Sequence, residues 1–451
     1  MLQKTRNWDL GMSVFPNSDS ASATLFERAR KVMPGGNSRH TVYTSPYPIY
    51  AVKGQGARVT DADGVERLDF INNYTSMIHG HAFAPVVEAL RKQAGDLIAV
   101  GAPSSLEIEL AELLTARVPS LEQVRFCNSG SEAVMFAMKA ARANTGRSKI
   151  AKIEGCYHGS YDYAEVSQQP KPKLWGEADR PVATATSAGT PQGVLDDMVI
   201  LPMNDLPAAR AIIAANADNL AGVLLDPLPS RLMFVQMTPE FAQGVAEAIR
   251  AVGGLLIVDE VYTLRLDVPG RQPWLGVKAD IVTMGKIMGG GLPVGAFGGS
   301  AEVLSVYDQT LGHAKVGHGG TFNASPMTMA AGLAAMRALD ADAMAHINAL
   351  GERLREGLSN ILRTLNLGGP VLGAGSLATF LPGGEDIATV RDVARQPQVF
   401  QTLSKLHVEL LNRGVLINPA IHYVISTPMT AADVDFTLEQ TEAGLRAVIL
   451  T

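Results

Sequence analysis

The chain has 451 residues, of which 47% are hydrophobic and 18% charged, and its formal net charge is −6. This length favours two or more domains, and the composition is that of a well-packed globular protein. The acidic balance, without a long basic run, argues against nucleic acid as a partner. Two cysteines without metal-ligand spacing, Cys127 and Cys156, predict no metal site and a cytoplasmic location. Neither a signal peptide nor an apolar stretch long enough for a bilayer is evident, so no membrane association is expected.

The N-terminal part predicts a tail, a helix and a small sheet. Residues before Phe15 have the character of a tail. Residues 20–32 predict a helix that the Pro-Gly-Gly at 34–36 ends. Apolar runs within 49–70 alternate with glycine-containing turns, which predicts a small antiparallel sheet.

The middle of the chain alternates helical patterns with short apolar strands. Strands are predicted at 124–127, 149–153, 222–225, 255–258 and 281–284, with a further candidate at 294–298. This alternation predicts an α/β fold, with a mainly parallel sheet covered by helices on both faces. Residues 161–198 are rich in Pro, Gly, Ser and Ala, and predict a long irregular segment of the kind that often forms a lid.

The C-terminal part predicts a second, smaller α+β domain. Helices are expected at 327–338, 343–362 and 432–448, and short strands at 376–381, 415–418 and 423–426. We expect this part to share a core with the N-terminal sheet. The predicted division is therefore a large domain at 76–330, and a small domain in which 1–75 joins 331–451.

Two predicted strands bring a carboxylate and an amine to the same edge of the sheet. The strand at 255–258 runs into Asp259, and the strand at 281–284 leads to Lys286, which glycines flank. Ligands of open α/β sheets bind at the carboxyl ends of the strands. A fixed amine and a fixed carboxylate suit pyridoxal phosphate (PLP), whose aldehyde bonds to a lysine and whose ring nitrogen needs an acid. Alternatively, Lys286 is a solvated loop lysine and Asp259 a metal ligand or a helix cap.

A serine-glycine turn after the strand at 124–127 is a candidate phosphate site. Ser129, Gly130 and Ser131 stand at the start of a predicted helix, where free amide groups and hydroxyls could bind an anion. Ser129 and Glu132 also have the spacing of a capping box, which is a purely structural explanation.

Three other loops add candidate binding groups. Tyr157 offers a flat face for stacking on a ring and His158 a nearby donor, although an aromatic packed under a loop is the simpler explanation. Gly-Gly-Thr-Phe-Asn at 319–323 is a second glycine-hydroxyl site. Arg39, in the N-terminal loop, could hold a substrate carboxylate through two parallel hydrogen bonds, or lie on the surface.

In this order the motifs resemble those of fold-type I PLP enzymes of the class III aminotransferase family. They are nearest the branch that contains glutamate-1-semialdehyde aminomutase and the β-amino acid aminotransferases. The resemblance extends from residues 32–36 to the terminal helix. The compact motif at 259–265 resembles the β-amino acid enzymes more than the aminomutase.

The resemblance implies a role for each candidate residue. Lys286 would carry the Schiff base and Asp259 would pair with the pyridinium nitrogen. The implied coenzyme set is completed by Val261 and Tyr157 on the two faces of the ring, Gly130 and Ser131 at the phosphate, and Ser129, His158 and Asp226 nearby. Thr321 would reach the phosphate from the partner subunit of a homodimer whose active site lies at the interface. Arg39 would bind the substrate carboxylate, with Tyr74 as a second substrate contact.

Three departures from the family pattern concern the substrate. Asp226-Pro227 replaces the usual Glu-Pro, Ala420 occupies the position of a second carboxylate-binding arginine, and residues 171–198 are long for the β-amino acid enzymes. We therefore expect transamination between an amino donor and a keto acid, where the donor is an amino acid, with β-amino acids as one option, or an amine. The alternative is an aminomutase or racemase on the same scaffold. A PLP-dependent transcription regulator is disfavoured, because too few residues precede the sheet to build a DNA-binding domain.

Overall fold

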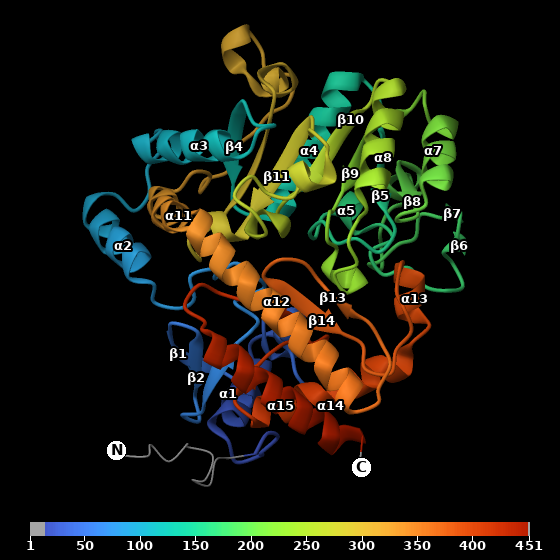
Figure 1. Cartoon of the computed structure of the whole chain (residues 1–451). Coiled ribbons are helices and arrows are strands. Elements are labelled where there is room, and N and C mark those ends of the chain that lie inside the picture. The colour runs from blue at the N-terminus through green and yellow to red at the C-terminus, as the bar shows by residue number, and fades with distance from the viewer. Residues whose placement is uncertain (1–13, 450–451) are drawn as a thin grey trace.

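A seven-stranded sheet forms the centre of the protein in the computed structural model, which describes residues 14–449 (Figure 1). The strand order is β4 (Gln123–Cys127), β12 (Gly295–Gly299), β11 (Ile281–Gly285), β10 (Leu255–Asp259), β9 (Leu220–Leu225), β5 (Lys149–Ile153) and β8 (Met198–Leu201). Neighbours from β11 to β8 pair in parallel, and β12 runs antiparallel to β11 and β4. The six predicted strands are confirmed. The seventh, β8, was missed because it directly follows the segment predicted to be irregular.

The sheet is buried on both faces, as the strand pattern predicted. Ile257 packs in a cluster with residues of α4, whereas its neighbours Leu256 and Val258 pack in the opposite cluster with residues of α8. Helices of this part are α2 (Ala84–Asp96), α3 (Ser105–Arg117), α4 (Gly130–Thr145), α7 (Leu206–Ala215), α8 (Pro239–Ala251), α9 (Gln272–Leu275), α10 (Ala301–Leu304) and α11 (Pro326–Ala338). The carboxyl ends of β10 and β11 lie in register, so Asp259 pairs with Thr283, just before Lys286.

Residues 161–198 contain only short elements, but they are tied to the sheet. They include α5 (Asp162–Glu165), the hairpin β6 (Gly176–Glu177)–β7 (Arg180–Pro181) and α6 (Gln192–Asp196). The fully buried Lys152 on β5 donates hydrogen bonds to the carbonyls of Ala164 and Val166, at 2.7 and 2.8 Å. A lid function for this segment stays a prediction.

Both ends of the chain build the other half of the fold, below the large sheet in Figure 1. One sheet has the order β1 (Ala51–Gln55), β2 (Arg58–Asp61), β3 (Glu66–Asp69) and β15 (Val415–Leu416), and another has β13 (Val371–Leu372), β14 (Leu377–Phe380) and β16 (Tyr423–Val424). The helices are α1 (Ala21–Arg30), α12 (Ala341–Thr364), α13 (Val390–Ala394), α14 (Pro397–Asn412) and α15 (Ala431–Ile449).

The pairing of β3 with β15 confirms that the two ends share a sheet. Helix α14 was missed by the sequence analysis. The predicted tail falls on residues 1–13, outside the described part, and the domain boundaries at 75 and 330 stay predictions. Across 14–449, no helix is long and apolar enough to cross a bilayer.

Candidate active site

Lys286 is the first residue after β11 and lies at the carboxyl-terminal edge of the large sheet. Its φ of 51° lies in the left-handed region, which is unfavourable for a residue with a Cβ and is typical of functional sites. The ammonium nitrogen lies 4.6 Å from the ring centroid of Tyr262. Burial lowers the pKa of Lys286 to about 8, although the carboxyl groups of Asp259 and Asp226 oppose this shift. Lys286 is only partly exposed, and its role stays a prediction.

Asp259 ends β10 and is buried with three hydrogen-bond partners. Its Oδ1 accepts from the Val261 amide and from the Thr283 hydroxyl, each at 3.0 Å, and its Oδ2 lies 2.8 Å from Nδ1 of His158. Burial lowers the pKa of His158, so its imidazole is neutral and Nδ1 donates to the carboxylate. Nε2 of His158 is buried and has no hydrogen-bond partner among the described residues. Asp259 and His158 thus form an oriented acid–imidazole pair at the strand end.

Asp226 follows β9, next to β10 in the sheet, and is also buried. Burial, followed by the neighbouring charge of Asp259, raises the pKa of Asp226 to about 8. The Leu228 amide donates to its Oδ1 at 3.0 Å. At neutral pH the Asp226 carboxyl is therefore mostly protonated.

The start of α4 has the capping arrangement that the sequence predicted. The Ser129 hydroxyl accepts from the Glu132 amide at 3.1 Å, and Glu132 accepts from the Asn128 amide at 2.8 Å, so this end is capped. The first amides of a helix lack intrahelical acceptors. Gly130 lies against the side chain of Val261, because a Cβ on Gly130 would stand 2.9 Å from Val261 Cγ1. The helix start therefore faces the segment that follows Asp259.

Tyr157 and His158 lie on a loop that is docked on this helix start. The Ser131 hydroxyl accepts from the Ser160 amide at 3.1 Å. Tyr157 is 40% exposed, and the guanidinium of Arg231 stands 5.4 Å from its ring centroid. Tyr157 is thus not packed under the loop.

Arg39 meets a strained turn that follows β3. Four successive residues, Asn72 to Thr75, have φ between 45° and 76°. Within this turn the Asn73 side chain accepts from Nη1 of Arg39 at 2.8 Å, and the Tyr74 ring lies 5.9 Å from the guanidinium. The Tyr74 hydroxyl donates to the Thr41 carbonyl, and burial raises the pKa of this phenol. Arg39 is exposed, as its surface alternative also predicted.

Thr321 is exposed, and within the described chain it does not lie at the candidate phosphate site at the start of α4. Its loop is anchored two residues later, where the side chains of Asn128 and Asn323 form a hydrogen bond of 2.8 Å.

Tyr262 and Thr283 are site residues for which the sequence analysis gave no role. Tyr262 contacts Lys286, lies 5.9 Å from Phe234 between ring centroids, and is close enough to Asp226 and Tyr74 for their charges to affect its pKa, which burial raises. The only available signal was its position directly after Asp259-Glu260-Val261.

Comparisons with known proteins show similarity over most of the chain. Residues 40–438 match the family described as aminotransferase class-III. Over 96% of its length the chain is 35% identical to glutamate-1-semialdehyde 2,1-aminomutase of Aeropyrum pernix, 99% of which is covered. Over 93% it is 35% identical to β-phenylalanine transaminase of Variovorax paradoxus, with 92% covered. An ω-transaminase structure from Sphaerobacter thermophilus is 50% identical and superimposes with a TM-score of 0.93, over 96% of this chain and 98% of that one. The expected fold-type I architecture is confirmed.

Proposed function

The chain belongs to the class III aminotransferase family and is a PLP-dependent transaminase, and we propose that it takes its amino group from a carboxylate-bearing amino acid, β-amino acids first, and passes it to a keto acid. The location of Lys286 beside Asp259 and Tyr262 carries the assignment of the reacting centre. Arg39 on its strained turn carries the assignment of the donor class.

The residues at the sheet edge fit PLP. When bound, this coenzyme supplies an aldehyde for the amino group and a ring that accepts electrons from the substrate carbon. Lys286 would supply the amine for the aldehyde, and Asp259 would pair with the ring nitrogen. Gly130 and Ser131, with Ser129, would hold the phosphate at the start of α4, where Gly130 lies against Val261, and Val261 and the partly exposed Tyr157 would contact the ring. His158 and Asp226 are the remaining residues proposed to contact the coenzyme.

Proton transfer falls to Lys286. A pKa of about 8 leaves a useful fraction of the amine unprotonated at neutral pH, so Lys286 both removes the proton from the substrate carbon and returns it. The hydrogen bonds from Thr283 and Val261 fix the direction of the Asp259 carboxylate.

The donor carboxylate binds to Arg39, with Tyr74 beside it. Asn73 already occupies one nitrogen of the guanidinium, which leaves other N–H groups for a carboxylate. Ala420 supplies no second cation, so one carboxylate is bound by one arginine. This arrangement suits a donor with a single carboxylate and an uncharged side chain, such as β-phenylalanine, which gives the Variovorax relative its name.

The active unit is a homodimer in the cytoplasm. The exposed loop around Thr321 supports the assembly, because it offers a hydroxyl that can reach the phosphate of the partner subunit. Cys127 and Cys156 are both free and buried, which suits a reducing compartment.

Aminomutase or racemase activity is the second candidate, favoured by the aminomutase relative that covers nearly the whole chain. The purified coenzyme-loaded enzyme should be mixed with the donor alone, without a keto acid. A transaminase is expected to lose the visible absorbance of the lysine-bound coenzyme stoichiometrically and to release an equal amount of free carbonyl product. If substrate is isomerised or racemised catalytically while no carbonyl product leaves, the transfer assignment is wrong.

Replacing Arg39 with alanine tests the donor class. For β-phenylalanine, kcat/KM is expected to fall roughly 30-fold or more, because a charge-assisted contact worth about 2 kcal/mol is lost. For 1-phenylethylamine, which lacks the carboxylate, it should change less than about threefold. Arg28→Ala, on helix α1, is the control. Equal losses with both donors would show that Arg39 does not recognise the carboxylate.

A further inference from the structure

A short helix from the C-terminal part, α13, lies against the loop that carries Tyr157 and His158. Its anchor is Arg391, whose side chain is only 6% exposed and whose partner Glu154 is 4% exposed. The guanidinium makes two parallel hydrogen bonds to the carboxylate, Nε to Oε2 at 2.8 Å and Nη2 to Oε1 at 3.0 Å. Such bidentate pairs fix direction as well as distance.

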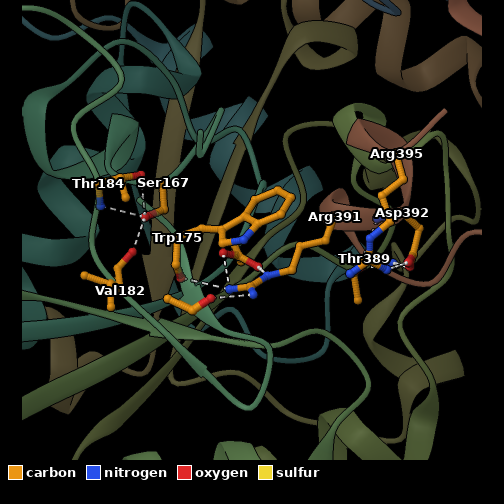
Figure 2. Close-up of polar contacts among 10 residues, drawn as sticks. Ser167, Trp175, Val182, Thr184, Thr389, Arg391, Asp392 and Arg395 are labelled. Carbon is orange, nitrogen blue, oxygen red and sulfur yellow. Dashed lines mark hydrogen bonds and ion pairs between the residues drawn. The ribbon is translucent and has the colours of Figure 1, made fainter. Parts of the chain in front are cut away.

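The same guanidinium also holds the β6–β7 hairpin region, as Figure 2 shows. Nη2 donates to the Trp175 carbonyl at 2.9 Å, and Nη1 donates to the Gly176 carbonyl at 2.8 Å. The Trp175 ring centroid is 4.8 Å from the guanidinium carbon. Arg391 therefore joins three parts of the chain: the C-terminal half, the end of β5 and the segment of residues 161–198.

Side-chain contacts of Val390, on α13, lead on to the proposed coenzyme loop and the substrate wall. Val390 covers Gly155 so closely that a Cβ on this glycine would stand 2.5 Å from Val390 Cβ. The same added Cβ would stand 2.9 Å from Leu232, on the wall that follows Asp226, so these three residues meet at one point. Tyr157, two residues after Gly155, is contacted by Arg231 from that wall. The location of α13 thus helps to set the location of the Tyr157 ring.

We propose that Arg391 is a positioning residue for the coenzyme, acting through Glu154 on the loop of Tyr157 and His158. The inference rests on the proposed coenzyme contacts of this loop. The ion pair holds the loop in its binding conformation, so that PLP meets an ordered ring face. Without the pair, part of the binding energy is spent on ordering the loop.

Arg391→Met is expected to weaken PLP binding to the apoprotein roughly tenfold, measured by equilibrium titration well below the melting temperature. Arg67→Met is the matched control. Arg67 is 4% exposed and pairs with Asp61, which is 3% exposed, on the sheet of β2 and β3. Both variants should lower the melting temperature of the apoprotein by several degrees, because each leaves a buried carboxylate unpaired. Of these two variants, only Arg391→Met should change the PLP dissociation constant. Arg395→Met, one turn along, should change neither the melting temperature nor the PLP dissociation constant.

Two further variants separate positioning from loss of stability. Arg391→Lys keeps the charge but not the bidentate geometry, and should recover part of the PLP affinity. Adding Glu154→Gln to Arg391→Met should weaken PLP binding less than the product of the single effects, because both act through one contact. In the apoprotein, the tryptophan fluorescence of Arg391→Met should differ from that of wild type, because the guanidinium no longer lies over the Trp175 ring.

The proposal is overturned if Arg391→Met binds PLP within twofold of wild type, or if Arg67→Met weakens PLP binding as much. Failure of wild type to bind PLP would instead overturn the proposed function.

Discussion

Lys286→Ala is expected to reduce transamination roughly 10⁶-fold, because one side chain both bonds to the aldehyde and moves the proton. The purified variant should lack the visible absorbance of the lysine-bound coenzyme, while its circular dichroism remains that of wild type. PLP should still associate through the proposed phosphate site at Gly130 and the proposed contact with Asp259, but it should wash out on dialysis.

The control for this variant is Lys278→Ala, which removes an exposed lysine near β11. Its turnover and absorbance should equal those of wild type. If Lys286→Ala retained turnover within tenfold of wild type, a different residue would have to supply the reacting amine. The proposed reacting centre at Lys286 and Asp259 would then be wrong.

Asp259→Asn is expected to reduce kcat about a thousandfold with little change in size or shape at the site. The neutral amide cannot keep the ring nitrogen of the coenzyme protonated, and it cannot orient His158 as a carboxylate does. Steady-state kinetics with saturating PLP should show the fall in kcat, and the absorbance of the lysine-bound coenzyme should persist, because Lys286 is intact.

Glu260→Gln is the matched control for this substitution. The adjacent carboxylate is also buried, but it points to the other side, where it accepts from the amides of Arg271 and Gln272 at 2.8 and 3.1 Å. Glu260→Gln should cost stability and leave kcat within about threefold of wild type. If the two variants lost activity equally, the effect of Asp259 would be structural.

The reacting centre was predictable because strand ends are local features. An apolar run ending on Asp259 and another leading to Lys286 suffice to place both groups at one sheet edge, and the register of β10 with β11 confirms that expectation. The N-cap role of Ser129 was equally visible, since Glu132 stands three residues later.

The rest depends on contacts between distant residues. Tyr262 was overlooked because nothing in its own segment shows that its ring would lie beside Lys286. The raised pKa of Asp226 results from burial and from Asp259 on a neighbouring strand, neither of which a single strand reveals. Arg391 and Glu154 are 237 residues apart, and no sequence period links them.

The parallel pairing of Leu68 on β3 with Val415 on β15 has a consequence for biosynthesis. At translation rates of roughly 5 to 20 residues per second, the ribosome needs on the order of 20 to 70 seconds to add the chain between these two partners. During that interval the outer edge of β3 has exposed backbone donors and acceptors, which invite pairing with other nascent chains. We therefore expect the cellular yield of this enzyme to depend on elongation speed and on chaperones that shield unpaired strands.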